Sequence, residues 1–192
     1  MTWLGAFGEG FAVLAAAGGP DVHPHAASPA EERARWDADM ANFNGDLKKV
    51  ERFFLDTLES RLAGDDVAKT ARTFYGEQGP WYTVGWRMAV LIEKTYGRPR
   101  LIECMCDVRK LLPTYNRAAA KLNRRSAGKL ALWSDSLVQR VESSKRRRQN
   151  HISAARRNYG HSGHLAPRNV TAAGTRPPTR RLSSTPKAWG GG

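Results

Sequence analysis

One carboxylate, Glu9, lies between two glycines in an apolar, alanine-rich stretch near the start of the chain, within the run FGEGFA of residues 7–12. A carboxylate that is buried without a partner is costly, so its presence there needs a reason. Such a group can serve as one ligand of a metal ion. The small residues Gly8, Gly10 and Ala12 would let its helix approach a second ligand-bearing helix closely. The alternative is an exposed glutamate on a helix with flexible glycines, and these six residues alone favour it.

Tyr82 is a second candidate, near the start of the most apolar segment of the chain, which opens at Gly79-Pro80 and continues to Tyr96. A phenol can donate a hydrogen bond to the oxyanion of a tetrahedral intermediate. Alternatively, Tyr82 is an aromatic anchor that packs its ring and hydrogen-bonds its hydroxyl, which is the interpretation we favour.

Several segments that follow FGEGFA occur in the same order as in a known family. They are DADMANFN at 37–44, FFLD at 53–56, GPWYTVGWRMA at 79–89, LIECMCD at 101–107 and YN at 115–116. Over about residues 1–142 the chain resembles a family of uncharacterised bacterial, gluzincin-like peptidases that are inferred to depend on zinc. In that family a His-Glu-x-x-His helix comes first, then a Glu-Gly segment, then a helical region with a Gly-Pro-Trp-Tyr-like motif.

The resemblance implies a role for both candidates. Glu9 would be the third protein ligand of a catalytic zinc, and Tyr82 would stabilise the oxyanion. In such enzymes two histidines one helical turn apart and a carboxylate from a neighbouring helix leave one zinc position for water. The complete parent protein would therefore bind zinc and act on a peptide substrate.

The His-Glu-x-x-His motif is absent from the 192 residues. His23 and His25 are two apart across a proline, the wrong spacing for one helix face, and the other histidines lie in the C-terminal tail: His151, His161 and His164. Two metal ligands and the general base are therefore missing. We expect a fragment or degenerate member of the family that is inactive and binds no zinc alone. Either the first metal helix lies upstream of Met1 in the parent, or it has been lost.

The net charge of +13 is concentrated at one end of the chain. Residues 143–192 contain eleven of the 31 Lys and Arg residues and no Asp or Glu, so residues 1–142 hold 20 basic and 18 acidic residues. The tail has few large apolar residues and cannot bury enough surface to offset its ordering entropy. We predict a helical domain over 1–142 and a disordered basic tail over 143–192.

The tail permits two interpretations. Its charge would bind nucleic acid non-specifically, or other acidic partners, in which case the protein would be a small helical interaction protein. However, Tyr159 and Trp189 are too few for a stacking platform, and no recognition motif occurs. A mixture of Arg, Pro, Ala, Ser, Thr and Gly without acids is also typical of out-of-frame translation of GC-rich DNA. The tail would then be a frameshift product.

The elements that must position Glu9 and Tyr82 are helices, and we predict an all-α, irregular bundle of about six. Gly and Pro punctuation, caps and three-to-four-residue apolar spacing indicate their bounds. Ser28 begins a capping box with Pro29 at the first helical position. The predicted helices are 3–17, 28–62 with a kink at Asn44-Gly45, 65–75, 80–96, 99–112 stopped by Pro113, 114–123 capped by Thr114, and one from Ser134.

The remaining charged residues and cysteines have structural interpretations. Glu93, Glu103 and Asp107 are predicted as helix-face charges, with Arg87 as the partner of one of them. Cys104 and Cys106, two apart on a helix, are poorly placed to bridge each other. No apolar run reaches the length of a membrane span, and Gly8, Glu9 and Gly10 interrupt residues 1–17, which rules out a signal peptide there. Taken as written, the chain is predicted to be cytoplasmic and not to associate with a membrane. Its oligomeric state stays open.

Overall fold

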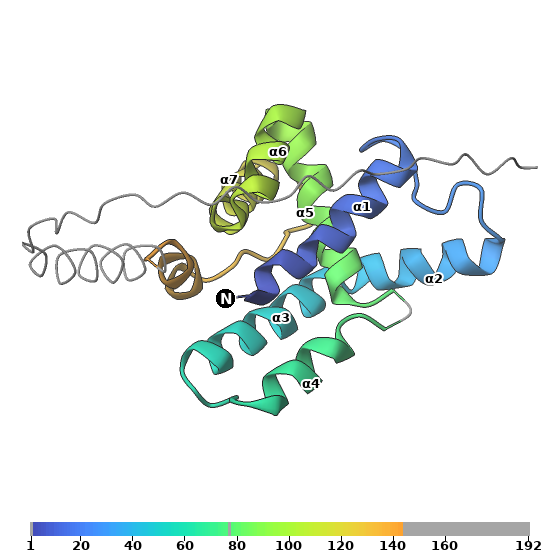
Figure 1. Cartoon of the computed structure of the whole chain (residues 1–192). Helices are drawn as coiled ribbons and strands as arrows, with labels where there is room; N and C mark the ends of the chain where they lie inside the picture. Colours follow the sequence, from blue (N-terminus) through green and yellow to red (C-terminus); the bar gives the residue numbers. More distant parts are fainter. Residues whose placement is uncertain (1, 77, 144–192) are drawn as a thin grey trace, which may run out of the picture. The chain divides into compact units, whose positions relative to one another are not determined.

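The computed structural model describes residues 2–76 and 78–143, so the predicted disordered tail lies, from residue 144 on, outside the described residues. Within the described part all regular structure is helical, which confirms the all-α prediction (Figure 1). The elements are η1 (Thr2–Phe7), α1 (Gly8–Ala17), α2 (Ala30–Ala41), α3 (Phe43–Leu58), α4 (Asp65–Thr73), α5 (Pro80–Tyr96), α6 (Arg98–Cys106), η2 (Val108–Lys110), α7 (Leu111–Asn123) and a helical segment over 135–143.

The helix α5 is the centre of the packing, because α1, α3, α6 and α7 all contact it (Figure 1). It starts at Pro80, where a missing N–H costs nothing, and ends before Gly97, which has a φ of 84°. Both bounds agree with the prediction. Trp81 is fully buried, and its indole N–H donates to the Ala71 carbonyl at 2.9 Å. Its ring meets Phe7 edge-on, with centroids 5.2 Å apart.

α1 and α5 make the most extensive contact between any two of the labelled elements. Glycines on both helices allow it. A Cβ at Gly10 would overlap the backbone of Gly85 and Trp86, and a Cβ at Gly85 would lie 2.7 Å from the Phe7 carbonyl oxygen. The two backbones therefore touch where Gly10 crosses Gly85. The close approach predicted for the glycines around Glu9 occurs at Gly10, and its partner is α5.

The predicted long helix over 28–62 is two helices, α2 and α3, with the break at Asn42 rather than at Asn44-Gly45. The predicted capping box is wrong: Pro29 occupies the N-cap position, and no side chain caps α2. The Ser28 hydroxyl instead lies 3.1 Å from His25 Nδ1. The Ser28 side chain is therefore directed to His25 rather than to the first turn of α2.

The predicted stop at Pro113 is also wrong. α6 ends at Cys106, and α7 runs through Pro113, which is its third residue. Proline is tolerated there because the first turn of a helix has no acceptor for its N–H groups. Thr114 does not cap a helix; it is buried within α7, where its hydroxyl accepts from Arg100 at 3.0 Å.

The chain after α7 is tied to α3 by hydrogen bonds. The buried Glu51 accepts from the Ser134 backbone N–H and from Lys48, and Asn44 bonds the backbone of the same segment. Ser134 caps the helical segment over 135–143 by accepting from the Leu137 N–H at 3.4 Å, as predicted.

Both cysteines are free, Cys104 buried and Cys106 exposed, as expected from their spacing. Among the described residues, none of the helices combines the length and apolarity that crossing a bilayer requires.

Candidate functional site

The crossing of α1 and α5 brings together the two residues singled out from the sequence. Glu9 is the second residue of α1 and Tyr82 the third of α5, and both are half-buried. Burial raises the pKa of Tyr82, and the negative charge of Glu9 and a hydrogen bond with it raise this pKa further. The pKa of a phenol is near 10 even without these effects, so the Tyr82 hydroxyl is protonated at neutral pH.

Gly10 determines where Glu9 points. Successive side chains on an α-helix are about 100° apart, so a Gly10 that faces α5 directly turns its neighbour Glu9 to one side of the contact. Gly8 lies on the other side and has no atom within 4 Å of an added Cβ. Glu9 thus lies at the edge of the helix contact, between the buried Gly10 side and the exposed Gly8 side of α1.

The side of α5 that carries Tyr82 also holds buried polar atoms without a partner. Trp86 lies one turn after Tyr82, and its indole N–H has no hydrogen-bond acceptor among the described residues. The side-chain oxygen of Gln78, just before α5, has no donor within the part of the chain that the structure describes. Tyr75 packs edge-on against Tyr82 with ring centroids 6.3 Å apart. Buried polar atoms of this kind can bind a polar ligand or an ordered water.

The two described histidines are already hydrogen-bonded. His23 Nδ1 accepts from the His25 backbone N–H at 3.0 Å, and His23 Nε2 lies 3.1 Å from an Asp37 carboxylate oxygen. His25 Nδ1 lies 3.1 Å from the Ser28 hydroxyl, and its Nε2 lies 3.2 Å from the Gln78 amide nitrogen. These bonds hold the loop between α1 and α2 against the start of α5.

The described residues alone do not provide the ligands of a zinc site. Within 2–76 and 78–143 no three His, Cys, Asp or Glu side chains come together in a group that could hold a metal. Glu9 has Tyr82 beside it rather than an imidazole. The remaining histidines, His151, His161 and His164, lie outside the described residues.

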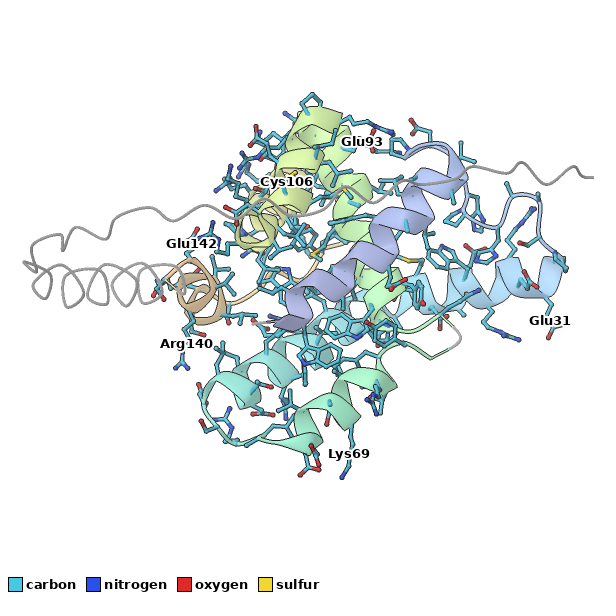
Figure 2. The ribbon with its side chains drawn as sticks, viewed as in Figure 1. Glu31, Lys69, Glu93, Cys106, Arg140 and Glu142 are labelled. Carbon is cyan, nitrogen blue, oxygen red and sulfur yellow. The ribbon has the colours of Figure 1, made fainter. Side chains whose placement is uncertain are left out.

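The three acids predicted as helix-face charges have arginine partners, each a different one. Glu93, labelled near the end of α5 in Figure 2, pairs with Arg98 at 2.7 Å. Glu103 pairs with Arg100 at 2.6 Å, and Asp107 with Arg109 at 2.5 Å. The predicted pairing of Arg87 with one of them is therefore wrong.

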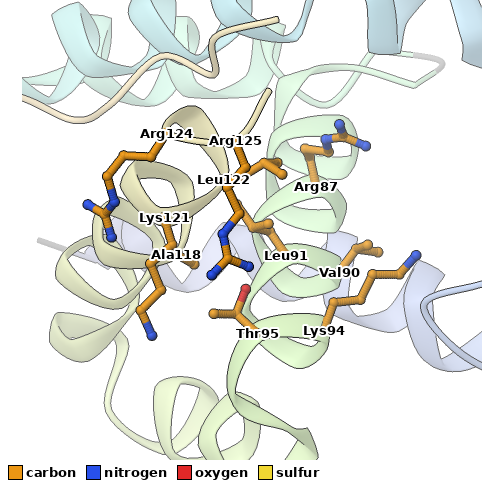
Figure 3. Close-up of a pocket in the computed structure, with 10 residues that line it drawn as sticks. All are labelled: Arg87, Val90, Leu91, Lys94, Thr95, Ala118, Lys121, Leu122, Arg124 and Arg125. Atoms are coloured by element: carbon orange, nitrogen blue, oxygen red, sulfur yellow. The ribbon is translucent and has the colours of Figure 1, made fainter. Parts of the chain in front are cut away.

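Arg87 instead lines a pocket between α5 and α7, which the sequence did not reveal (Figure 3). The signal that was available is the spacing of its basic residues. Arg87 and Lys94 are seven apart, two turns along α5. Lys121, Arg124 and Arg125 are three and four apart, one turn apart at the end of α7. Nothing in the sequence indicated that the two groups face each other.

A family model described as "Putative zinc dependent peptidase (DUF5700)" matches residues 1–124. The match includes Glu9, Tyr82 and the glycines at the crossing. No curated protein and no solved structure matches the chain.

Proposed function

Since the chain belongs to the family described as "Putative zinc dependent peptidase", we propose that it carries part of a peptidase site, in which Glu9 is one metal ligand of the complete protein and Tyr82 stabilises the oxyanion. The observation that carries this proposal is the meeting of Glu9 and Tyr82 across the α1–α5 crossing. The two residues are far apart in sequence, yet they are close in space.

The protonation state of Tyr82 supports its role. Burial and Glu9 raise the pKa of Tyr82 and so favour its protonated form, in which the single O–H is shared with Glu9 until a stronger acceptor such as an oxyanion is present. A hydrogen-bond donor held beside the reacting carbonyl is what a developing oxyanion requires.

The open side of α1 supports the role of Glu9. Gly5 and Gly8 have no atom within 4 Å of an added Cβ, and Ala12 is exposed. A helix that bears the two missing histidines could therefore approach Glu9 on this side, as the family pattern requires. The chain alone has one carboxylate of the three ligands and no general base, and so we propose that it has no peptidase activity by itself.

Zinc titration of the purified full chain at neutral pH tests the incomplete site. We expect no tight, stoichiometric zinc in the unmodified chain, in Glu9→Ala or in the control Glu31→Ala, which removes an exposed carboxylate in the first turn of α2. Tight stoichiometric zinc that is lost in Glu9→Ala and kept in Glu31→Ala would contradict the proposal. An in-frame His-Glu-x-x-His segment in the DNA before Met1 would identify the source of the missing ligands.

A second function is favoured by the charge of the tail. Eleven basic residues without an acid support non-specific binding of nucleic acid. We expect DNA binding that weakens steeply with salt and disappears when residues 144–192 are deleted. Binding that persists after the deletion would exclude the tail as its source.

A further inference from the structure

A cavity of about 660 Å³ lies between α5 and α7, within the size range of small-molecule sites. We call it the arginine pocket. α5 contributes one wall, and α7 with the turn after it contributes the other (Figure 3). Its lining residues are Arg87, Val90, Leu91, Lys94, Thr95, Ala118, Lys121, Leu122, Arg124 and Arg125. Five of these ten are basic and none is acidic.

The two lysines of the arginine pocket already have partners. Lys94 pairs with Asp21 at 2.6 Å, and the Lys121 ammonium lies 4.5 Å from the centre of the Tyr96 ring. The three arginines differ: none of them forms an ion pair with a carboxylate within the described part of the chain. The charge of Arg87 acts on the phenol of Tyr115.

This clustering of positive charge is local. Residues 1–142 are close to neutral, with 20 basic and 18 acidic residues, while the pocket gathers five cations around one cavity. Like charges in a shared cavity repel one another, and a bound anion relieves that repulsion. Residues 143–192 contain no Asp or Glu, so no side chain of the tail can supply the anion.

The walls of the arginine pocket determine what kind of anion fits. Val90, Leu91 and Leu122 provide apolar surface, and Thr95 provides a hydroxyl. A phosphate monoester carries about −1.5 to −2 charges at neutral pH and three acceptor oxygens. Guanidinium groups bind such oxygens in a bidentate manner. A single carboxylate would leave most of the positive charge unmatched.

We propose that the arginine pocket binds a small organic phosphate, with the phosphate against Arg87, Arg124 and Arg125 and the organic part against Val90, Leu91 and Leu122. This site lies on the α7 side of α5 and is separate from the proposed peptidase site. Neither Glu9 nor Tyr82 lines it.

Calorimetric titration of the full chain with phenyl phosphate tests the proposal. We expect phenyl phosphate to bind saturably at one site per chain. Its affinity should be at least about tenfold higher than that of inorganic phosphate or of benzoate. The triple variant Arg87→Gln, Arg124→Gln, Arg125→Gln should weaken it by at least about tenfold, since it removes three charged donors. The matched control Arg146→Gln, Arg147→Gln, Arg148→Gln removes the same charge from the tail and should change the affinity less than about threefold.

Folding of the triple variant is checked by its melting temperature, which should equal or exceed that of the unmodified chain because like-charge repulsion is reduced. The single variant Arg125→Gln, at an exposed position, gives a second and milder test. Equal losses in the pocket variant and the tail control would overturn the proposal, as would benzoate that binds as tightly as phenyl phosphate. Binding only to phosphatidylcholine vesicles that contain phosphatidic acid, without binding of phenyl phosphate, would also overturn it.

Discussion

Substitution of Gly10 by alanine is the sharpest test of the α1–α5 crossing. A Cβ at this position would overlap backbone atoms of Gly85 and Trp86, with even the third-nearest atom, Gly85 Cα, only 2.6 Å away. Ordinary van der Waals contact begins near 3.4 Å, so the helices must move apart by at least 0.8 Å. The obstacle is main chain on a buried helix, and a rotamer change cannot remove it.

The cost follows from the side chains that α1 and the turn before it bury. Phe7, Phe11 and Leu14 are at most 5% exposed, and burial of each contributes about 2.5 kcal/mol. A gap approaching 1 Å removes about a quarter to a half of the contact energy, or roughly 2–4 kcal/mol in total. Alanine regains about 0.5–1 kcal/mol through a less flexible unfolded chain. We therefore expect Gly10→Ala to destabilise the protein by about 2 kcal/mol.

Thermal unfolding followed by circular dichroism measures the effect, and Gly8→Ala is the matched control two residues away on the same helix. No atom lies within 4 Å of a Cβ at Gly8, so this variant should be neutral or more stable by up to about 1 kcal/mol. Gly10→Ala should melt about 6 °C below the unmodified chain, with Gly85→Ala between the two variants. Equal melting temperatures for Gly8→Ala and Gly10→Ala would refute the close crossing.

Three further predictions concern single side chains. Glu9→Gln should lower the pKa of Tyr82 toward its ordinary value, because it removes the neighbouring negative charge. Absorbance titration measures this pKa, and the variant Tyr82→Phe identifies the Tyr82 signal. An unchanged titration midpoint would show that Glu9 does not interact with Tyr82. Glu51→Gln should cost about 1–2 kcal/mol at pH 7. Burial raises the pKa of Glu51, but bonds from Lys48 and Ser134 outweigh it, so the folded pKa is lowered. This contribution is present above the unfolded pKa near 4.5 and is lost as pH falls through the folded pKa, so the urea midpoints of Glu51→Gln and the unmodified chain should converge as the pH is lowered below the folded pKa. Tyr115→Phe removes a 2.8 Å bond to the Ala131 carbonyl and should cost about 1 kcal/mol in urea unfolding; no cost would mean that water replaces the bond.

Punctuation by proline and glycine predicted α5 well and α6–α7 poorly, for one physical reason. Pro80 is the first residue of α5, and Gly97 follows its last residue. Gly97 has a φ of 84°, a conformation that ends a helix and that glycine adopts readily. Pro113 fits two outcomes, because proline can end one helix or stand in the first turn of the next. Packing decides between them: Leu111 and Leu112 are fully buried at the start of α7, so the helix begins before the proline.

The site was only half predictable from the sequence. The residue types and small neighbours of Glu9 indicated a close helix contact, and the Gly-Pro-Trp-Tyr segment indicated Tyr82. Which helix would meet Glu9 was not predictable, because Gly10 and Gly85 are far apart in the chain and glycine specifies no partner. The arginine pocket illustrates the same limit, since its two groups of cations lie on separate helices and face each other only through the packing of α5 against α7.

Stability and site geometry depend on the same pair of glycines. Gly10 sets the distance between α1 and α5, and its neighbour Glu9 therefore reaches Tyr82 only while the backbones touch. If this coupling holds, Gly10→Ala must reduce the pKa shift of Tyr82 as well as the melting temperature, even under conditions where the variant is fully folded. A variant that loses stability but keeps the full shift would mean that Glu9 is positioned by contacts other than the crossing. The absence of a β-carbon at Gly10 would then serve packing alone.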